Sequence, residues 1–452
     1  MLRSSPLGGK QGCWRGSLRK GDALADEGVA SRRAASGDAA EGRGVPTPLW
    51  AAVAFSFANS LASGVISNGI FFVTEHGYQF DRVKNYALAG ATGVVYIVGA
   101  LTAGRAVGAL RARYGVSERG VLVALMFVFG VLCAIPQVAW WMARDGSRPP
   151  ESPIWISVIG YQLFSGALWP IVESYVSGGR SGKDLRRALG TWNVVWSGAL
   201  VVGIMFIAPL IQEHAVLSVL LLGLIHVSSL AVLPWFPNRP PEHVEEHHEA
   251  HPAVYSKLLV TFRVLLPTSY TVLTALTPFL PFAAKSLTES AFLQGLSPIA
   301  WLLPRCVGFL VLDRWHGWHG RWAMPIAGGI LILLGFAGAV LAPWLALGTV
   351  GIVLFLGGLA LFGLGMSTIY TGAIYYAMSV GKAEVDAGGT HEGLIGLGYT
   401  VGPTFGLLAA LGVSQGVISE RGFEPAVLGA VGVLALAVTG LVIWNIQRRV
   451  RG

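Results

Sequence analysis

From Leu49 onward, the chain consists of apolar segments, most of which are 20 or more residues long. A helix of about 20 residues crosses the roughly 30 Å hydrocarbon layer of a membrane, where the backbone must satisfy its own hydrogen bonds. The pattern therefore predicts an all-α membrane protein with twelve transmembrane helices. The predicted spans are 49–73, 86–110, 119–143, 154–178, 188–211, 215–236, 258–284, 291–312, 323–342, 346–378, 391–413 and 425–447.

The composition indicates that this protein is surrounded by a lipid bilayer. Charged residues make up 12% of the chain, which is about half of their share in an average soluble domain. So few charges could not cover the surface of a water-soluble protein of this length. The three cysteines, Cys13, Cys133 and Cys306, lie far apart and indicate neither a disulfide framework nor a metal-binding motif.

The positive charges predict the topology of the spans. The two tails and the loops predicted on the same side of the membrane as the tails hold 23 Lys and Arg residues in total. The loops on the other side hold 6. The positive-inside rule then predicts a multi-pass protein of the cell (inner or plasma) membrane with both termini in the cytoplasm. The net charge of +8 is therefore a sign of topology, and we predict no nucleic-acid partner.

Polar segments flank and divide the spans. His243, His247 and His251 recur every fourth residue in the middle segment, a spacing that could hold a metal ion on a helix. The segment lacks the H-E-x-x-H pattern, so we interpret it as a solvated connection and predict no metal site. The predicted segments are a disordered cytoplasmic tail (1–48), a cytoplasmic linker rich in His and Glu (237–257) and a basic C-terminal tail (448–452).

An internal repeat relates the two halves of the chain. Arg105, Gly108 and Leu110 recur as Arg305, Gly308 and Leu310, at an offset of 200 residues. The pairs Gly190-Thr191 and Gly389-Thr390 repeat at nearly the same offset. We therefore expect two pseudo-symmetric six-helix bundles, 49–236 and 258–447. Repeated halves around a central pathway are typical of secondary transporters.

The loop after the second span resembles a signature of the major facilitator superfamily, G-x-L-x-D-R-x-G. The matching residues are Gly108, Leu110, Arg113 and Gly115, whereas Ala112 occupies the acidic position. The second half keeps Gly308, Asp313 and Arg314 with one extra residue of spacing. With its twelve spans and long middle loop, the chain is similar to this superfamily over residues 49–447. The resemblance implies the superfamily's fold and transport by rocker-switch alternating access, and it leaves the solute open.

Charged residues within the spans are candidates for function, because a charge in a membrane helix costs about 2.5–3.5 kcal/mol. The resemblance implies that the spans holding Arg105 and Glu392 meet on the cytoplasmic side when the transporter faces outward. We therefore expect Arg105 and Glu392 to form a gate latch, and Arg305 to contact Asn193, the repeat equivalent of Glu392. Two alternatives remain open. Glu392 could favour a helix N-terminus that Thr390 caps, while Arg105 snorkels, or His391 and Glu392 could couple transport to protons.

Glu173 lies in the fourth span, one turn after Pro170. One interpretation is a structural carboxylate, ion-paired with an Arg of the second span or of the following loop. The other is a carboxylate that couples transport to protons. Most intramembrane charges are paired, which favours the structural interpretation.

Neutral polar and aromatic side chains suggest the lining of a cavity. The resemblance implies that the first, fourth, seventh and tenth spans line it. As a set, these residues predict a small, neutral or weakly polar solute; taken singly, each could instead bridge neighbouring helices. The candidates are Asn59, Asn68, Gln162, Tyr270, Thr274, Tyr370 and Tyr375.

The sequence thus predicts a secondary active transporter for a small molecule, acting as a monomer, with H⁺ or Na⁺ as candidate coupling ions. The alternatives are a polytopic membrane enzyme centred on His391 and Glu392, or a non-transporting sensor on the same fold. The short loops hold no catalytic cluster, so we predict no enzyme activity and no catalytic residue. We predict no cofactor, and the motif G-x-x-x-x-G-K-[ST] for direct use of ATP does not occur.

Overall fold

The computed structural model describes residues 45–143, 150–242, 252–345, 348–380 and 385–451. Most of the predicted N-terminal tail and the linker residues His243, His247 and His251 lie outside these ranges. Throughout the described ranges, all regular secondary structure is helical. The predicted all-α fold class is confirmed.

The N-terminal half begins with a span that changes helix type in its middle. The first elements are α2 (Leu49–Gly64), the π-helical turn η1 (Val65–Gly69) and α3 (Ile70–Tyr78). The remaining helices of this half are α4 (Arg82–Tyr114), α5 (Glu118–Met142), α6 (Glu151–Ser177), α7 (Gly182–Ile207) and α8 (Ile211–Ser228), with the 3₁₀ turns η2 (Ala208–Leu210) and η3 (Ser229–Trp235).

The C-terminal half also begins with an interrupted span. α9 (Ala253–Leu276) passes through the 3₁₀ turn η4 (Thr277–Phe279) into α10 (Leu280–Leu287). Pro278 and Pro281 lie at this interruption, and each proline removes a hydrogen bond that a continuous α-helix would need. The other elements are α11 (Ala291–Leu296), α12 (Ile299–Arg314), η5 (His316–Trp318), α13 (Ala323–Leu345), α14 (Gly348–Val380), α15 (Val385–Ser414), η6 (Glu420–Gly422) and α16 (Phe423–Arg451).

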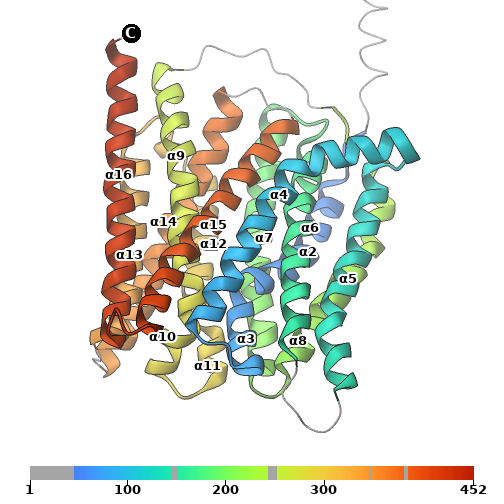
Figure 1. The fold of residues 1–452 in the computed structure, drawn as a ribbon. Helices are drawn as coiled ribbons and strands as arrows, with labels where there is room; N and C mark the ends of the chain where they lie inside the picture. Colours follow the sequence, from blue (N-terminus) through green and yellow to red (C-terminus); the bar gives the residue numbers. More distant parts are fainter. Residues whose placement is uncertain (1–44, 144–149, 243–251, 346–347, 381–384, 452) are drawn as a thin grey trace, which may run out of the picture. The chain divides into compact units, whose positions relative to one another are not determined.

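These helices make twelve crossings within the described residues. Eleven ranges are long and apolar enough to span a membrane, and one of them, Gly182–Trp235, has 54 residues. As one straight helix, that range would be about 80 Å long. It turns at Ala208–Leu210 instead, so it holds two crossings. The two six-helix halves follow one another along the chain (Figure 1).

The two ends of the bundle can be told apart by their loops. We call the end that holds residues 178–181 and 236–242 the linker end, and the end that holds residues 79–81 and 288–290 the opposite end. The C-terminus of α16 lies at the linker end (Figure 1). The positive charges predict that the linker end faces the cytoplasm.

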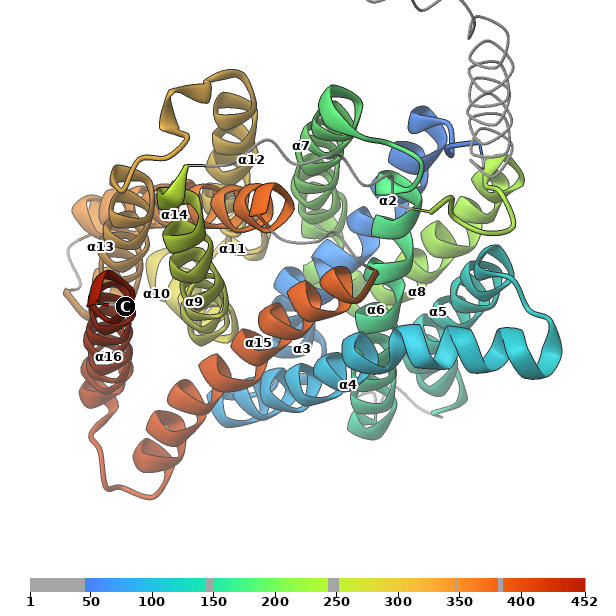
Figure 2. The ribbon, with the colours of Figure 1, turned by 90° about the horizontal axis from the view of Figure 1, so that it is seen from above.

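The halves meet along two helix pairs, α4 with α15 and α7 with α12. From above, α4 runs beside α15 (Figure 2). Glycine permits the close approach of α4 and α15, since a Cβ on Gly93 would lie 2.2 Å from the carbonyl oxygen of Tyr399. At the linker end of the other pair, a Cβ on Gly190 would lie 2.1 Å from a carboxylate oxygen of Asp313.

At the opposite end, polar contacts join the halves. The ammonium of Lys285 on α10 lies 2.6 Å from the carboxylate of Glu75 on α3. The hydroxyl of Tyr86 on α4 donates a 2.8 Å hydrogen bond to the carbonyl oxygen of Ala275 on α9. These contacts hold α3 and α4 against α9 and α10.

One predicted boundary is wrong in a way that matters for the site. The predicted span begins at residue 391, and one alternative has Thr390 capping it, but α15 begins at Val385. Gly389 stays helical where it packs on α4, and a Cβ there would lie 3.4 Å from the carbonyl oxygen of Ala100. Glu392 therefore lies two turns inside a helix, away from its positive end.

Candidate functional site: a cavity between the halves

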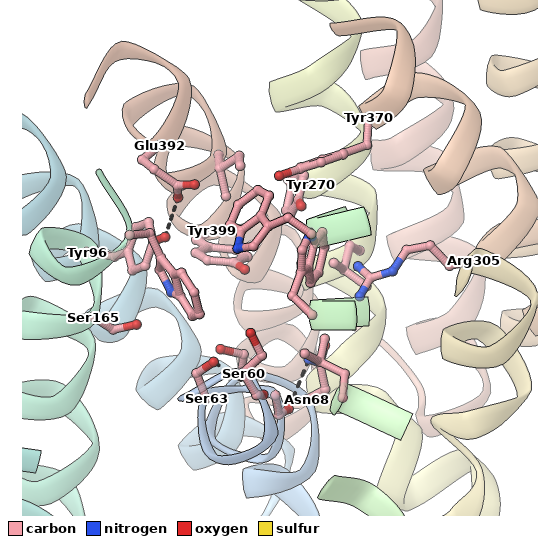
Figure 3. A pocket seen from close by; sticks show the side chains of 18 residues that line it. Ser60, Ser63, Asn68, Tyr96, Ser165, Tyr270, Arg305, Tyr370, Glu392 and Tyr399 are labelled. Atoms are coloured by element: carbon pink, nitrogen blue, oxygen red, sulfur yellow. Dashed lines mark hydrogen bonds between the residues drawn. The ribbon is translucent and has the colours of Figure 1, made fainter. Parts of the chain in front are cut away.

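A cavity of about 80 Å³ lies between the two halves, enough room for several water molecules. Both halves contribute to it, mainly with hydroxyl and aromatic side chains, together with one guanidinium and one carboxylate (Figure 3). Its lining is Ser60, Ser63, Gly64, Ser67, Asn68, Tyr96, Ser165, Trp169, Trp192, Trp196, Leu200, Tyr270, Leu273, Arg305, Tyr370, Glu392, Ile395 and Tyr399.

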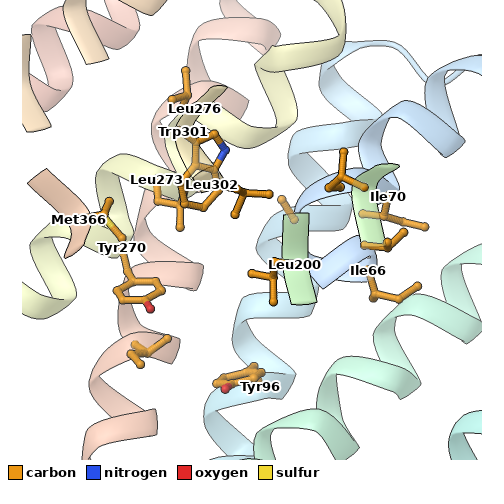
Figure 4. Close-up of a cluster of buried hydrophobic side chains, with 14 of the residues drawn as sticks. Ile66, Ile70, Tyr96, Leu200, Tyr270, Leu273, Leu276, Trp301, Leu302 and Met366 are labelled. Carbon is orange, nitrogen blue, oxygen red and sulfur yellow. The ribbon is translucent and has the colours of Figure 1, made fainter. Parts of the chain in front are cut away.

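An apolar layer separates this cavity from the opposite end. Apart from Ile66, which lies between Ser63 and Ser67 on the first span, its members lie further along their own helices toward that end than the polar residues of the cavity do. Figure 4 shows these side chains gathered between the halves. The layer comprises Ile66, Ile70, Leu200, Leu273, Leu276, Trp301 and Leu302, all of which belong to the hydrophobic core.

The guanidinium comes from Arg305 on α12, whose side chain is only 3% exposed. It lies between two indole rings, with its Cζ 4.8 Å from the ring centre of Trp196 and 4.8 Å from that of Trp301. The amide oxygen of Asn193 accepts a 2.9 Å hydrogen bond from the indole of Trp196. Asn193 and Trp196 on α7 thus position a cation that belongs to the other half.

The carboxylate comes from Glu392 on α15, which is 5% exposed. The hydroxyl of Tyr96 on α4 donates a short hydrogen bond to it (Figure 3). Glu173 on α6 lies within electrostatic range of Glu392. The site therefore holds one carboxylate in its lining, and a second carboxylate, from the other half, lies within electrostatic range of it.

The polar floor of the cavity belongs to the first span. Asn68 lies in the π-helical turn η1 and donates a 3.0 Å hydrogen bond to the carbonyl oxygen of Gly64. Single π-helical turns occur often at functional sites, because they turn side chains out of the α-helical register. Ser60 and Ser63 precede this turn, and the hydroxyl of Ser60 has no hydrogen-bond partner in the described part of the chain.

The expected gate latch is not formed in this conformation. Arg105 is exposed on α4, nine residues beyond Tyr96, which corresponds to about 13 Å along the helix. In the described ranges it forms no ion pair with Glu392, whose partner is Tyr96 instead. The predicted contact of Arg305 with Asn193 is indirect, because Trp196 lies between them. Arg305 and Glu392 both line the cavity, although we expected them at a gate.

Glu173 also differs from the expectation. Within the described ranges, no Lys or Arg forms an ion pair with it, so the predicted structural pairing with an Arg is not observed. Its charged neighbour is the carboxylate of Glu392. The rings of the adjacent His391 and of Tyr370 form a T-shaped pair with 5.5 Å between their centres, and the buried Nε2 of His391 lacks a partner among the described residues.

The predicted cavity residues divide into two groups. Asn68, Tyr270 and Tyr370 line the cavity. Asn59 instead bonds His226 at 2.7 Å within the N-terminal half, and Gln162 bonds Ser67 at 3.4 Å, one side chain behind the lining. Two more lie elsewhere: Thr274 donates a 2.8 Å hydrogen bond to the carbonyl oxygen of Gly398 on α15, and the ring of Tyr375 stacks on His319 at the linker end.

The residues that match the superfamily signature lie near the linker end and outside the cavity. Gly115 ends α4 in the left-handed conformation with φ +69°, and Arg113 stacks on Tyr114. Gly108 and Leu110 are exposed on α4. In the second half, Gly308 packs against Ser367, Asp313 lies against Gly190 of the other half, and Arg314 is exposed in the last turn of α12.

The sequence did not single out most of the aromatic lining. Tyr96, Trp169, Trp192, Trp196 and Tyr399 sit in apolar spans, where aromatic residues are also common at the membrane interface. One signal could have found some of them: Trp192 and Trp196 are one helical turn apart, and Trp196 follows Asn193 by three residues.

Comparison with known proteins agrees with this architecture. The family model for the Major Facilitator Superfamily matches residues 49–407. The nucleoside transporter NupG superposes with a TM-score of 0.60 at 10% identity, covering 87% of this chain and 98% of NupG. The POT family transporter PepTSo superposes with a TM-score of 0.61 at 14% identity, covering 90% of this chain and 99% of PepTSo. The E. coli fucose:proton symporter FucP superposes with a TM-score of 0.51 at 14% identity, covering 86% of this chain and 98% of FucP. No curated protein sequence matches the chain.

Proposed function

The chain belongs to the Major Facilitator Superfamily, and from this premise we propose that it is a secondary active transporter. It is an integral, multi-pass membrane protein. In our proposal a small solute binds in the central cavity and crosses the membrane as the two halves rock about it. One chain supplies both halves and the whole lining, so we expect the monomer to be the working unit.

The observation that carries this proposal is the charged lining of the cavity. Arg305 and Glu392 are almost fully buried, yet they form no ion pair with each other in the described structure. Charges in the membrane interior are costly and mark solute or ion pathways. Because the two residues lie on helices at the contact between the halves, rocking of the halves would change their surroundings.

We further propose that H⁺ is the coupling ion and that Glu392 and Glu173 carry it. Two buried carboxylates within electrostatic range repel each other, and binding a proton on one of them removes that repulsion. The hydroxyl of Tyr96 can stay bonded to Glu392 in either protonation state, since it can donate or accept. The other titratable groups near this pair are His391, Tyr270, Tyr370, Tyr399 and, across the cavity, Arg305.

The positive-inside rule places the linker end in the cytoplasm in this proposal. The apolar layer and the Lys285–Glu75 ion pair would then close the extracellular side. The solute would exchange with the cytoplasm from this conformation.

Uptake by the purified protein in liposomes tests the proposal. The solute is found first, by a screen of thermal stabilisation across sugars, nucleosides, amino acids and organic acids. Ser67→Phe should fill the cavity and abolish uptake, whereas Val98→Phe, the control on the lipid-facing surface of α4, should retain it. If both variants transport equally well, the cavity is not the pathway.

A separate experiment tests proton coupling. Glu392→Gln should abolish accumulation driven by a proton gradient but retain exchange of solute across the membrane. Glu151→Gln, which alters a carboxylate paired with Lys84 away from the cavity, should leave the accumulation intact. Accumulation by Glu392→Gln that still follows the gradient would rule out this role of Glu392.

A further inference from the structure

Arg305 is a buried cation whose donors are not used. Its Nε and Nη2 are shielded from solvent and have no hydrogen-bond partner among the described residues. No carboxylate of the described ranges lies within ion-pair distance of it. Burying a guanidinium without an anion costs desolvation free energy. A bound anion would compensate for that cost.

The unused donors lie on one edge of the guanidinium. Nε–H and Nη2–H point the same way, and this geometry matches the two oxygens of a carboxylate. The guanidinium carbon lies 4.8 Å from the ring centres of both Trp196 and Trp301, so aromatic rings and no carboxylate surround the cation among the described residues. Asn193 fixes the ring of Trp196 through its 2.9 Å hydrogen bond. The cation is thus oriented before any ligand arrives.

The remainder of the cavity limits what the anion can be. Glu392 lies on the side away from Arg305 (Figure 3), with Glu173 near it. A second negative group on the solute would be repelled there. Hydroxyls of Ser60 and Ser63, the amide of Asn68 and several aromatic rings form the remaining surface. These walls suit a compact solute that carries one anionic group and a neutral body.

We propose that Arg305 is the anion-binding residue of the solute site, and that the solute is a small monocarboxylate held at the Nε–Nη2 edge. This inference rests on the proposed function and names its substrate class. It replaces the neutral solute that the sequence suggested, because Arg305 lines the cavity and does not serve as a gate contact.

Carboxylates paired with their primary amides test the inference on the full-length purified protein. The probes are lactate and lactamide, pyruvate and pyruvamide, and benzoate and benzamide, with thermal stability as the readout. At least one carboxylate should raise the melting temperature, and its amide should not. This comparison uses the wild-type protein and needs no variant to fold.

Variants then assign the effect to Arg305. Arg305→Gln should weaken binding of the stabilising carboxylate by about 30-fold or more, as for loss of one member of a buried charge pair. Arg305→Lys keeps the charge but lacks the two-donor edge, so it should restore only part of the affinity. Arg263→Gln, which removes an exposed guanidinium from α9, is the matched control and should bind as the wild type does.

Three results would overturn the inference: no carboxylate stabilises the protein, each amide stabilises it as well as its acid, or Arg305→Gln binds the carboxylate as the wild type does. If a neutral solute is nevertheless taken up by liposomes and blocked by Ser67→Phe, the proposed transport stands and only the anion site is wrong. If Ser67→Phe leaves uptake unchanged, the proposed function itself fails.

Discussion

The hydroxyl of Tyr96 on α4 donates a hydrogen bond to the buried carboxylate of Glu392 on α15. The two residues belong to different halves, so this contact joins the halves beside the cavity. Any movement that separates α4 from α15 at this level must break it. The bond therefore links the state of Glu392 to the conformation of the protein.

Replacing Tyr96 with Phe should loosen the two halves. Interhelical hydrogen bonds in membrane proteins contribute about 0.5–2 kcal/mol, so Tyr96→Phe should lower stability by that amount. Thermal unfolding of the purified protein measures it. Tyr399→Phe removes a hydroxyl from the neighbouring ring, 5.2 Å away between ring centres, and should have a smaller effect. Equal losses of stability in both variants would mean that the hydrogen bond to Glu392 does not stabilise the contact between the halves.

Gly93 should tolerate no side chain, because a Cβ there would lie 2.2 Å from the backbone oxygen of Tyr399. Gly93→Ala should force α4 and α15 apart at a cost of about 1–3 kcal/mol and reduce uptake. Gly104 on the same helix has open space where a Cβ would lie, with no neighbouring atom within 4 Å, so Gly104→Ala should be neutral or stabilising. Unfolding and uptake assays on the pair check this; similar behaviour of the two variants would contradict the packing argument.

The ion pair of Lys285 with Glu75 should hold the opposite end closed. Lys285→Glu places two carboxylates at the contact, so hydrogen–deuterium exchange should rise in α3 and α10. The double exchange Glu75→Lys with Lys285→Glu should restore protection. Lys84→Glu breaks the pair with Glu151 inside one half and should leave α10 unchanged. If Lys285→Glu exchanges no faster than the wild type, the ion pair does not control closure.

His319 should make the linker end sensitive to acid. Burial, then His316 and Arg186, lower the pKa of His319, and its ring stacks on Tyr375 with centres 4.2 Å apart. The lowered pKa means that the unfolded chain takes up the proton more readily, from about 6.5 downward. Above about pH 6.5, His319 is neutral in both states and costs no stability; as the pH falls below that value, the free energy of unfolding decreases.

The check is the difference in melting temperature between pH 7.5 and pH 5.5. His319→Phe should shrink that difference, because it keeps an aromatic ring on Tyr375 and removes the titration. His214→Phe, at the start of α8 on the opposite end, should leave the difference as it is. An unchanged acid response in the His319 variant would assign the effect to other groups.

The sequence predicted the spans well because hydropathy and length act locally. The repeat predicted two six-helix bundles, an arrangement that the described helices fit, and Asn68, Tyr270 and Tyr370 line the cavity, where we expect them. The start of α15 was wrong because Gly388 and Gly389 suggest a turn, whereas packing against α4 keeps Gly389 helical. Such a contact between residues nearly 300 positions apart leaves no trace in local sequence.

The roles of the charged residues could not be predicted for the same reason. Arg305 was expected at a gate, but its position between Trp196 and Trp301 depends on how α7 of one half meets α12 of the other. Asn59 was expected in the cavity, and it faces His226 instead because α2 and α8 pack within one half. Spacing along one helix gives the face of a residue and says nothing of its partner.

Labelling of one cavity residue from each side of the membrane tests alternating access of the cavity. The native Cys13, Cys133 and Cys306 are replaced by Ser, and Ser63→Cys places a single thiol in the cavity. A membrane-impermeant maleimide is then applied to right-side-out and to inside-out vesicles. If the two halves alternate, the thiol reacts from both sides, and the solute slows both reactions. Labelling from only one side, or from neither, would contradict alternating access.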